Sequence, residues 1–156
     1  MRTAARREPI EVAEPRRSDP TLGLLIGVRR QRLERQLQEC GSARQQWRAL
    51  RRQLRTHKLA WRDQLAAARH HWQRSRDGYF ALTLSHQEFQ TAKAVYERLK
   101  QAAAVTLHTW RAAAAASRQA GAAYFSARAR ARQAQLQQEK LTLLRAELAA
   151  QRPPEE

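Results

Sequence analysis

Cysteine and proline are scarce in this chain of 156 residues. Its single cysteine, Cys40, cannot form an intramolecular disulfide, which favours a reducing compartment. Proline is absent between Pro20 and Pro153, and glycine occurs only five times. Because both residues disfavour helix interiors, a stretch this long without proline, rich in Ala, Arg, Gln and Leu, is typical of long helices or a coiled coil.

Long apolar runs are also missing. The longest spans residues 22–28 and is followed at once by Arg29 and Arg30, whereas a helix that crosses a bilayer needs about 20 apolar residues. The N-terminal region does not follow the order of a secretory signal, because acidic residues and prolines separate its arginines from this run. The sequence therefore predicts a cytoplasmic protein without membrane insertion.

The arrangements that carry catalysis or bind metals are not visible either. No two of the five histidines lie three or four residues apart, so no pair shares a helix face on which to hold a metal. His57 and Cys40 fall on an apolar stripe, where a packed side chain is the simpler interpretation. There is no glycine-rich phosphate loop, zinc spacing or acid–base pair. We expect no enzyme activity, no cofactor and no metal.

Positive charge is abundant and comes mainly from arginine, with 26 Arg, four Lys and a formal net charge of +16. The excess is greatest in residues 29–76, which hold thirteen Arg and Lys58 against three acidic residues. Such a field favours acidic protein surfaces, nucleic acid or anionic lipid headgroups. Two other interpretations stay open, since arginine also solvates the outside of helices and follows genome composition.

Turn and cap signals divide the chain. Residues 1–20 predict a disordered N-terminal tail, in which Asp19 and Pro20 would start the first helix as cap and first residue. The helix would cover about 21–77 and end at Asp77-Gly78. A turn over about 78–84 and a second helix over about 85–151 complete a hairpin domain of residues 21–151, with a C-terminal tail at 152–156.

The start of the second helix and its end have clear signals. Ser85 and Glu88 match a capping box, in which each side chain accepts a hydrogen bond from the other residue's backbone amide. The two prolines Pro153 and Pro154 would stop the helix.

Apolar residues recur every seven positions in both helices. In the first helix the series is Ile26, Leu33, Cys40, Trp47, Leu54, Trp61, Ala68, with Leu37, Leu50, Leu65 and Trp72 between. The second helix has two series, Phe89, Tyr96, Ala103, Trp110, Ser117, Tyr124, Ala131 and Ala92, Leu99, Thr106, Ala113, Ala120, Ala127, Ala134, Leu141, Leu148. A sustained seven-residue repeat implies a left-handed supercoil. With a short loop between the rods, the predicted fold is all-α, a long antiparallel two-helix coiled-coil hairpin.

Two groups of residues are candidates for protein binding. Arginines cover several faces of the first helix, where they suit an acidic channel or a polyanion: Arg29, Arg30, Arg32, Arg35, Arg44, Arg48, Arg51, Arg52 and Arg55. Aromatic residues gather at the hairpin tip around Gly78, namely Trp72, Tyr79 and Phe80, together with Leu82 and Leu84. These aromatics either plug the end of the hairpin or form an exposed anchor for a partner.

A basic chain of this size, with two long helices around Ser85-His86-Gln87-Glu88 and no active site, resembles the FliJ/YscO family. That family supplies the stalk proteins of bacterial flagellar and type III secretion export machines. The resemblance covers about residues 20–150 and rests on architecture, charge and length. It implies a non-catalytic adaptor whose free ends enter the pore of a hexameric export ATPase and whose tip faces the export gate. The basic residues nearest the free ends would then contact the ATPase: Arg29, Arg30, Arg32, Arg35, Arg128, Arg130 and Arg132. It also implies a cytoplasmic location, or a peripheral one at the inner membrane through the secretion complex.

Other partners fit the same composition. The alternative is a basic coiled coil that binds nucleic acid, although the aromatic residues lie on the seam and form no stacking platform among the arginines. A scaffolding protein is a third interpretation. Binding to a membrane surface is weaker, because a helix that lies on lipid needs a broad free apolar face.

Overall fold

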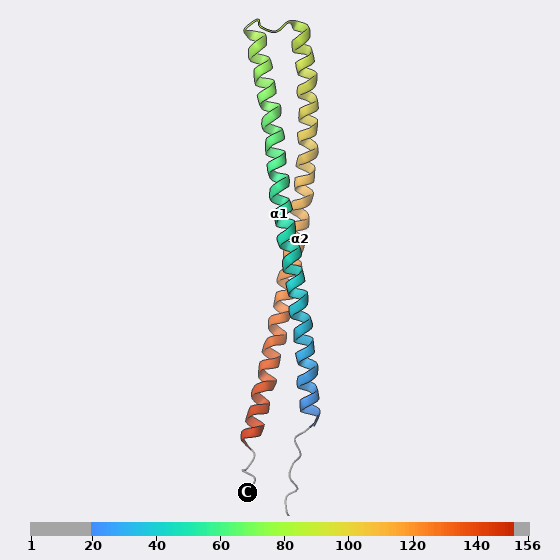
Figure 1. Ribbon diagram of the computed structural model, residues 1–156, viewed down its shortest axis with the longest axis vertical. Coiled ribbons are helices and arrows are strands. Elements are labelled where there is room, and N and C mark those ends of the chain that lie inside the picture. Colours follow the sequence, from blue (N-terminus) through green and yellow to red (C-terminus); the bar gives the residue numbers. More distant parts are fainter. Residues whose placement is uncertain (1–19, 152–156) are drawn as a thin grey trace, which may run out of the picture.

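The computed structural model describes residues 20–151 and forms two long helices joined by a short turn (Figure 1). Helix α1 spans Pro20–Phe80 and helix α2 spans His86–Ala150, with 61 and 65 residues. At 1.5 Å per residue each rod is about 90–100 Å long. No strand occurs in these residues, and the two helices pack against each other along their length, which confirms the predicted all-α helical hairpin. The expected tails, apart from Pro20, and the cap at Asp19 lie outside the described residues.

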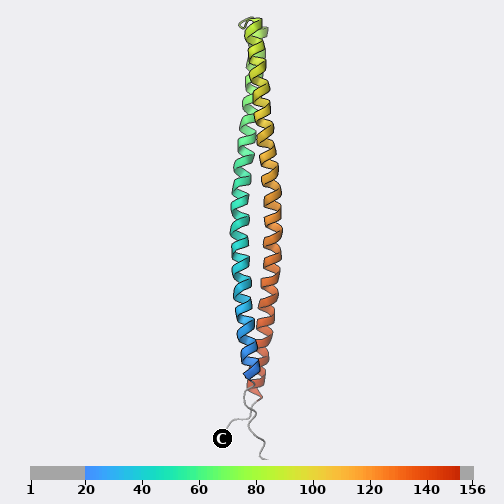
Figure 2. The same ribbon diagram turned by 90° about the vertical axis from the view of Figure 1, so that its right-hand side faces the viewer.

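The two helices wind around each other with a left-handed twist. In Figure 1, α1 passes in front of α2 from upper left to lower right, and in Figure 2 the two rods stand side by side at mid-length. The seven-residue spacing of the apolar stripe requires this hand, because a straight helix of 3.6 residues per turn would carry the stripe away from the partner.

The capping box at the start of α2 is present as predicted. The backbone amide of Glu88 donates to Oγ of Ser85 over 3.2 Å, and the amide of Ser85 donates to Oε2 of Glu88 over 2.7 Å. The hydrogen bond from the Ser85 backbone is the main reason why the pKa of Glu88 lies below its usual value of 4.5. Both hydrogen bonds satisfy amides that the helix itself leaves without acceptors.

The turn lies later in the chain than the sequence suggested. Helix α1 runs through Asp77 and Gly78 to Phe80, three residues beyond the expected end. Gly78 instead provides space for the returning chain, because a Cβ there would lie 3.0 Å from Cδ1 of Leu84. The amides of Thr83 and Leu84 both donate to the Gly78 carbonyl, over 3.0 and 3.3 Å. The glycine signal thus marks a close approach within the helix and not the helix end.

The core of the hairpin is one seam between the helices. Each residue of the two seven-step series in α2 is buried or half-buried as far as Leu141, and so is each residue of the series from Ile26 to Ala68 in α1. Aromatic rings from the two helices stack across this seam: Trp47 with Tyr124, Trp61 with Trp110, Trp72 with Tyr96 and Tyr79 with Phe89. Small residues lie between them and are the most buried: Ala68, Ser75, Ala103, Ser117, Gly121, Ala127 and Ala131.

Two expected seam residues lie elsewhere. Leu37 is 52% exposed, and the neighbouring Gln36 takes the inner position instead. Leu148 is 47% exposed near the free end of α2. The reason for the first error is the register: inner positions step back by seven from Leu50 to residues 43, 36 and 29, whichever side chains occupy them.

Gly121 lies in close contact with a ring of α1. A Cβ at this position would lie 3.0 Å from Nε1 of Trp47 and 3.4 Å from Cε2 of the same ring. The Trp47 ring also stacks on Tyr124 with centroids 5.4 Å apart, so it has little room to move away. A large ring on α1 therefore packs against the bare backbone of α2.

We predict that Gly121→Val destabilises the hairpin by about 1–3 kcal/mol, because the added side chain collides with Trp47. The matched control is Gly41→Ala, since nothing lies within 4 Å of a Cβ at Gly41. That change should stabilise the protein by about 1 kcal/mol through helix propensity. Urea unfolding followed by circular dichroism measures both, and equal effects of the two substitutions would contradict the packing described.

Candidate protein-interaction surfaces

The hairpin has two chemically different ends. At one end, here called the open end, the start of α1 lies beside the end of α2 (Figure 1). At the other end, the tip, residues 81–85 join the helices. Each of the two candidate groups lies at or close to one of these ends.

The arginines near the open end are in different environments. Nη1 of Arg29 donates to Oε1 of Gln137 over 2.6 Å across the seam, so Arg29 is half-buried between the helices. Nε of Arg30 lies 3.7 Å from Oε1 of Glu34 in a solvent-exposed ion pair. The remaining candidates are exposed and form no ion pair among the described residues: Arg32, Arg35, Arg128, Arg130 and Arg132.

The seam changes character toward the open end. Beyond the aromatic stacks, the inner positions include Arg29, Gln36, Gln137 and Gln138. Oε1 of Gln36 and Oε1 of Gln138 are both buried without a hydrogen-bond partner. A buried amide oxygen without a partner destabilises a fold by about 1–3 kcal/mol. The helices are therefore held together less firmly here than along the aromatic part of the seam.

The tip aromatics divide into packed and exposed residues. The Trp72 ring lies 4.9 Å from Tyr96 and 5.9 Å from Phe89, and Tyr79 lies 4.4 Å from Phe89. Trp72 and Tyr79 therefore close the end of the hairpin. Phe80 is 75% exposed, so it alone among the three candidates presents most of its side chain to a partner.

Leu82 belongs to the apolar group that the sequence placed at the tip, and it is the most exposed large apolar residue of the described chain. Its side chain is 90% exposed and its φ angle is +58°. The left-handed backbone conformation costs about 1–2 kcal/mol for a residue with a Cβ, and glycine or asparagine normally takes such a place. No seven-residue pattern extends into the turn, so only the backbone geometry shows that this leucine is strained.

Two of the five histidines lie where the helices meet. Nε2 of His71 lies 2.9 Å from the backbone oxygen of Ala92 on the other helix, and His57 is half-buried at the seam as expected. No group of three or more His, Cys, Asp or Glu residues within 20–151 could hold a metal ion.

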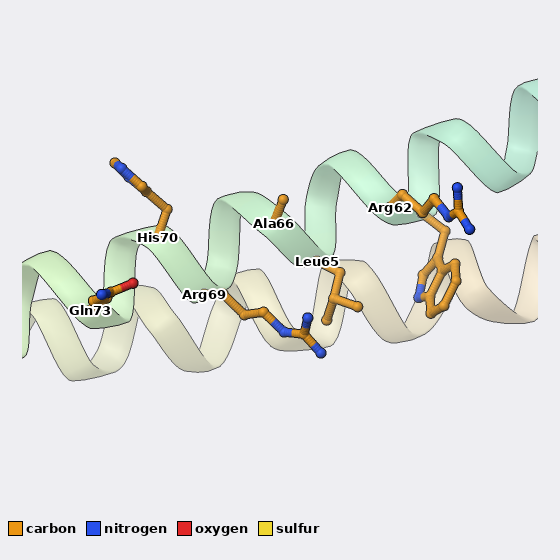
Figure 3. Close-up of a pocket in the computed structure, with 7 residues that line it drawn as sticks. Arg62, Leu65, Ala66, Arg69, His70 and Gln73 are labelled. Carbon is orange, nitrogen blue, oxygen red and sulfur yellow. The ribbon is translucent and has the colours of Figure 1, made fainter.

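A shallow depression lies on the surface of α1 (Figure 3). All of its lining residues come from this one helix, and the basic side chains of Arg62 and Arg69 contribute to it. It contains no nucleophile placed beside a base and no pair of carboxyl groups. The residues that line it are Trp61, Arg62, Leu65, Ala66, Arg69, His70 and Gln73.

Most of the positive charge of the rod has no acidic partner. Residues 20–151 contain 24 Lys and Arg but only eight Asp and Glu. Ion pairs among these residues hold only Arg30 and Lys100, while Arg51 lies over the Trp47 ring at 5.1 Å. Because the unpaired cations are exposed along the whole rod, its surface favours a partner with negative charge.

Comparisons with models of known protein families, with curated proteins and with solved structures find no match for this chain. Neither described helix has an apolar stretch long enough to cross a membrane. The geometry of the hairpin and the chemistry of its two ends are therefore the features that point to a function.

We predict that Leu82→Gly stabilises the hairpin by about 1 kcal/mol, because glycine adopts a positive φ angle without the clash of a Cβ. The control is Phe80→Gly, where the backbone is helical and the same substitution should destabilise by a similar amount. Thermal unfolding measures both changes. A lower unfolding temperature for Leu82→Gly would show that the leucine itself holds the turn.

Proposed function

We propose that this protein is a non-catalytic stalk or adaptor of a bacterial type III secretion or flagellar export apparatus. Its open end binds the hexameric export ATPase, and its tip contacts the export gate. The observation that carries the proposal is a stiff antiparallel rod of about 90–100 Å whose two ends differ in chemistry. A rod of this kind can join two partners that lie apart, and it needs no active site to do so.

The charge at the open end supports insertion into an acidic ring. Exposed arginines from both helices, including Arg32, Arg35 and Arg128, surround this part of the rod on several sides. A ring of subunits surrounds an inserted rod in the same way, so cations on every side find partners there. Electrostatic attraction of this kind accelerates association and orients the rod.

The tip supports a second and different contact. Phe80 and Leu82 are exposed apolar side chains on a turn that the Trp72 and Tyr79 rings make rigid. Apolar anchors on a rigid support are the usual energetic centre of a protein interface. In the proposed machine this contact is the one with the export gate.

The proposal predicts that the purified chain raises the turnover or the oligomerisation of its cognate export ATPase. Replacing Arg32 and Arg35 together by Glu should weaken half-maximal stimulation about tenfold or more, equivalent to about 1.4 kcal/mol, because these exposed cations would face the ring. ATPase assays over a range of chain concentrations measure the effect.

The matched control is the double charge reversal Arg111→Glu and Arg118→Glu at exposed positions in the middle of α2. It changes the net charge by the same amount away from the open end and should leave stimulation close to that of the wild type. If the wild-type chain has no effect at stoichiometric amounts, the proposed function is wrong.

The second candidate function is binding of nucleic acid, which the unpaired cations along the rod favour. The structure provides some support, because Phe125 is 54% exposed beside the Trp47 ring, over which Arg51 also lies. Most of the other aromatic rings are packed in the seam, where they cannot stack on bases.

This candidate predicts tight binding of duplex DNA with an affinity that falls steeply between about 0.05 and 0.2 M salt, because each neutralised phosphate releases counterions. Fluorescence anisotropy of a labelled duplex measures the salt slope. The stalk proposal predicts weak or negligible binding at both salt concentrations, so tight binding with a steep salt slope would favour the second candidate.

A further inference from the structure

The two sides of the open end differ in chemistry. In an antiparallel coiled coil each helix has two inner positions in every seven residues. The residues that directly precede the first of these positions lie on the same side of both helices. On α1, Leu25 directly precedes the inner residue Ile26. On α2, Gln137 directly precedes the inner residue Gln138, and Leu144 lies seven residues beyond Gln137 in the equivalent position. Counted from the Arg29–Gln137 hydrogen bond and from the Trp47–Tyr124 stack, Leu25 lies opposite residues 141 and 146 of α2, which brings it to about the level of Leu144.

The side that carries Leu25 and Leu144 is apolar, and we call it the apolar flank. Its members are Leu25, Val28, Leu144 and Leu148, which are 43%, 61%, 45% and 47% exposed. They come from both helices and cover about two helical turns beside the end of the seam. Because these four residues share one side and come from both helices, they form a group and are not isolated surface residues.

The opposite side of the open end is mainly polar. It carries Gly23, Arg30 and Leu37 on α1 and Gln135 and Thr142 on α2. Arg30 is paired with Glu34 on this side, and Nε2 of Gln135 donates to Oε1 of Glu139 over 3.2 Å. Polar contacts within each helix therefore satisfy this side, whereas the apolar flank has no cover within residues 20–151.

Basic residues adjoin the apolar flank on its inner side. Arg32, Arg35 and Lys140 follow it along the same side of the rod. Two acidic residues lie on this side near the open end, Glu147 on α2 and Glu39 one seven-residue step beyond Arg32, whereas Glu34 and Glu139 lie on the other side. The stretch of α1 from Leu25 to Arg35 is about 15 Å long. A partner that lies along it contacts apolar groups first and then the three cations.

From this geometry we propose that the apolar flank takes an acidic amphipathic helix of a partner protein, which lies between α1 and α2 as the third helix of a bundle. Its apolar residues cover Leu25, Val28 and Leu144, and its carboxylates pair with Arg32, Arg35 and Lys140. A third helix also excludes water from the polar end of the seam, where the Gln36 and Gln138 side-chain oxygens have no hydrogen-bond partner. Three helices bury two stripes on each rod, where two helices bury one.

A second copy of this chain fits the flank poorly. Its flank would bring its own Arg32, Arg35 and Lys140 against the same three cations. Like charges in contact oppose association, and the net charge of +16 adds repulsion over the whole rod. Charge complementarity therefore favours an acidic partner over self-association.

This inference rests on the proposed function for the place where the surface acts, because the flank belongs to the end assigned to the ATPase. It adds that the element recognised is an acidic amphipathic helix. A binding experiment without the ATPase tests the helix-binding inference separately from the proposed function. Binding of an acidic helix without ATPase stimulation would overturn the proposed function and leave the inference standing.

The experiment titrates the full chain with a labelled synthetic peptide of three heptads, with Leu at inward positions and Glu at the flanking ones. Fluorescence anisotropy measures the affinity, and circular dichroism measures the helix gained on binding. The double substitution Leu25→Glu and Leu144→Glu should weaken binding at least tenfold. Both positions are exposed, so circular dichroism should show that the hairpin itself stays folded.

The matched control is Leu37→Glu with Thr142→Glu, which adds the same charge on the opposite side and should change the affinity less than twofold. Equal weakening by both pairs, or no binding of the peptide by the wild-type chain, would overturn the inference. So would a dimer in sedimentation experiments that the Leu25→Glu and Leu144→Glu pair dissociates. Binding only after removal of residues 1–19 would also overturn it, because the chain would then cover its own flank.

Discussion

Two helices offer each other only one stripe of surface, and every other feature of this hairpin follows from that limit. No third layer exists in the described residues to bury side chains that the seam leaves out. The seam therefore has to supply nearly all of the packing energy. It does so by pairing large rings with small residues, as where Trp47 approaches the backbone of Gly121 and where Trp61 stacks on Trp110. Close approach of the axes replaces the missing second layer.

The aromatic contacts are not evenly distributed, and this unevenness separates the two ends. From Trp47 to the tip, the seam contains four stacked pairs of rings. Toward the open end the inner positions become polar, and two glutamine oxygens are buried without partners. A rod built this way is firmest near its turn and least satisfied where its helices begin and end. The open end is thus the part with most to gain from a partner, because a bound helix can cover both polar and apolar groups.

The candidate sites show how far residue patterns reach. The sequence located the arginines and the tip aromatics, since clusters of charge and rings are visible without a fold. It placed Trp72 on the apolar stripe but could not tell that Tyr79 faces inward while Phe80 faces solvent, because that depends on where the helix ends. Nor could it place Arg29 between the helices, since the register that puts an inner position there is set by residues further along the rod. The apolar flank needed both helices in register before it became visible.

The sequence by itself determined that the chain forms two long helices, where the second begins and which stripe each buries. These features are local: the absence of internal proline, the capping box of Ser85 and Glu88, and the seven-residue period are all readable along one helix. Only the tertiary structure decided that α1 continues through Gly78, that Gln36 and not Leu37 faces the partner helix, and that Leu25 lies beside Leu144. The first outcome depends on how the chain returns over Gly78 in the turn. The other two depend on register between residues more than 80 positions apart, which no period within one helix specifies.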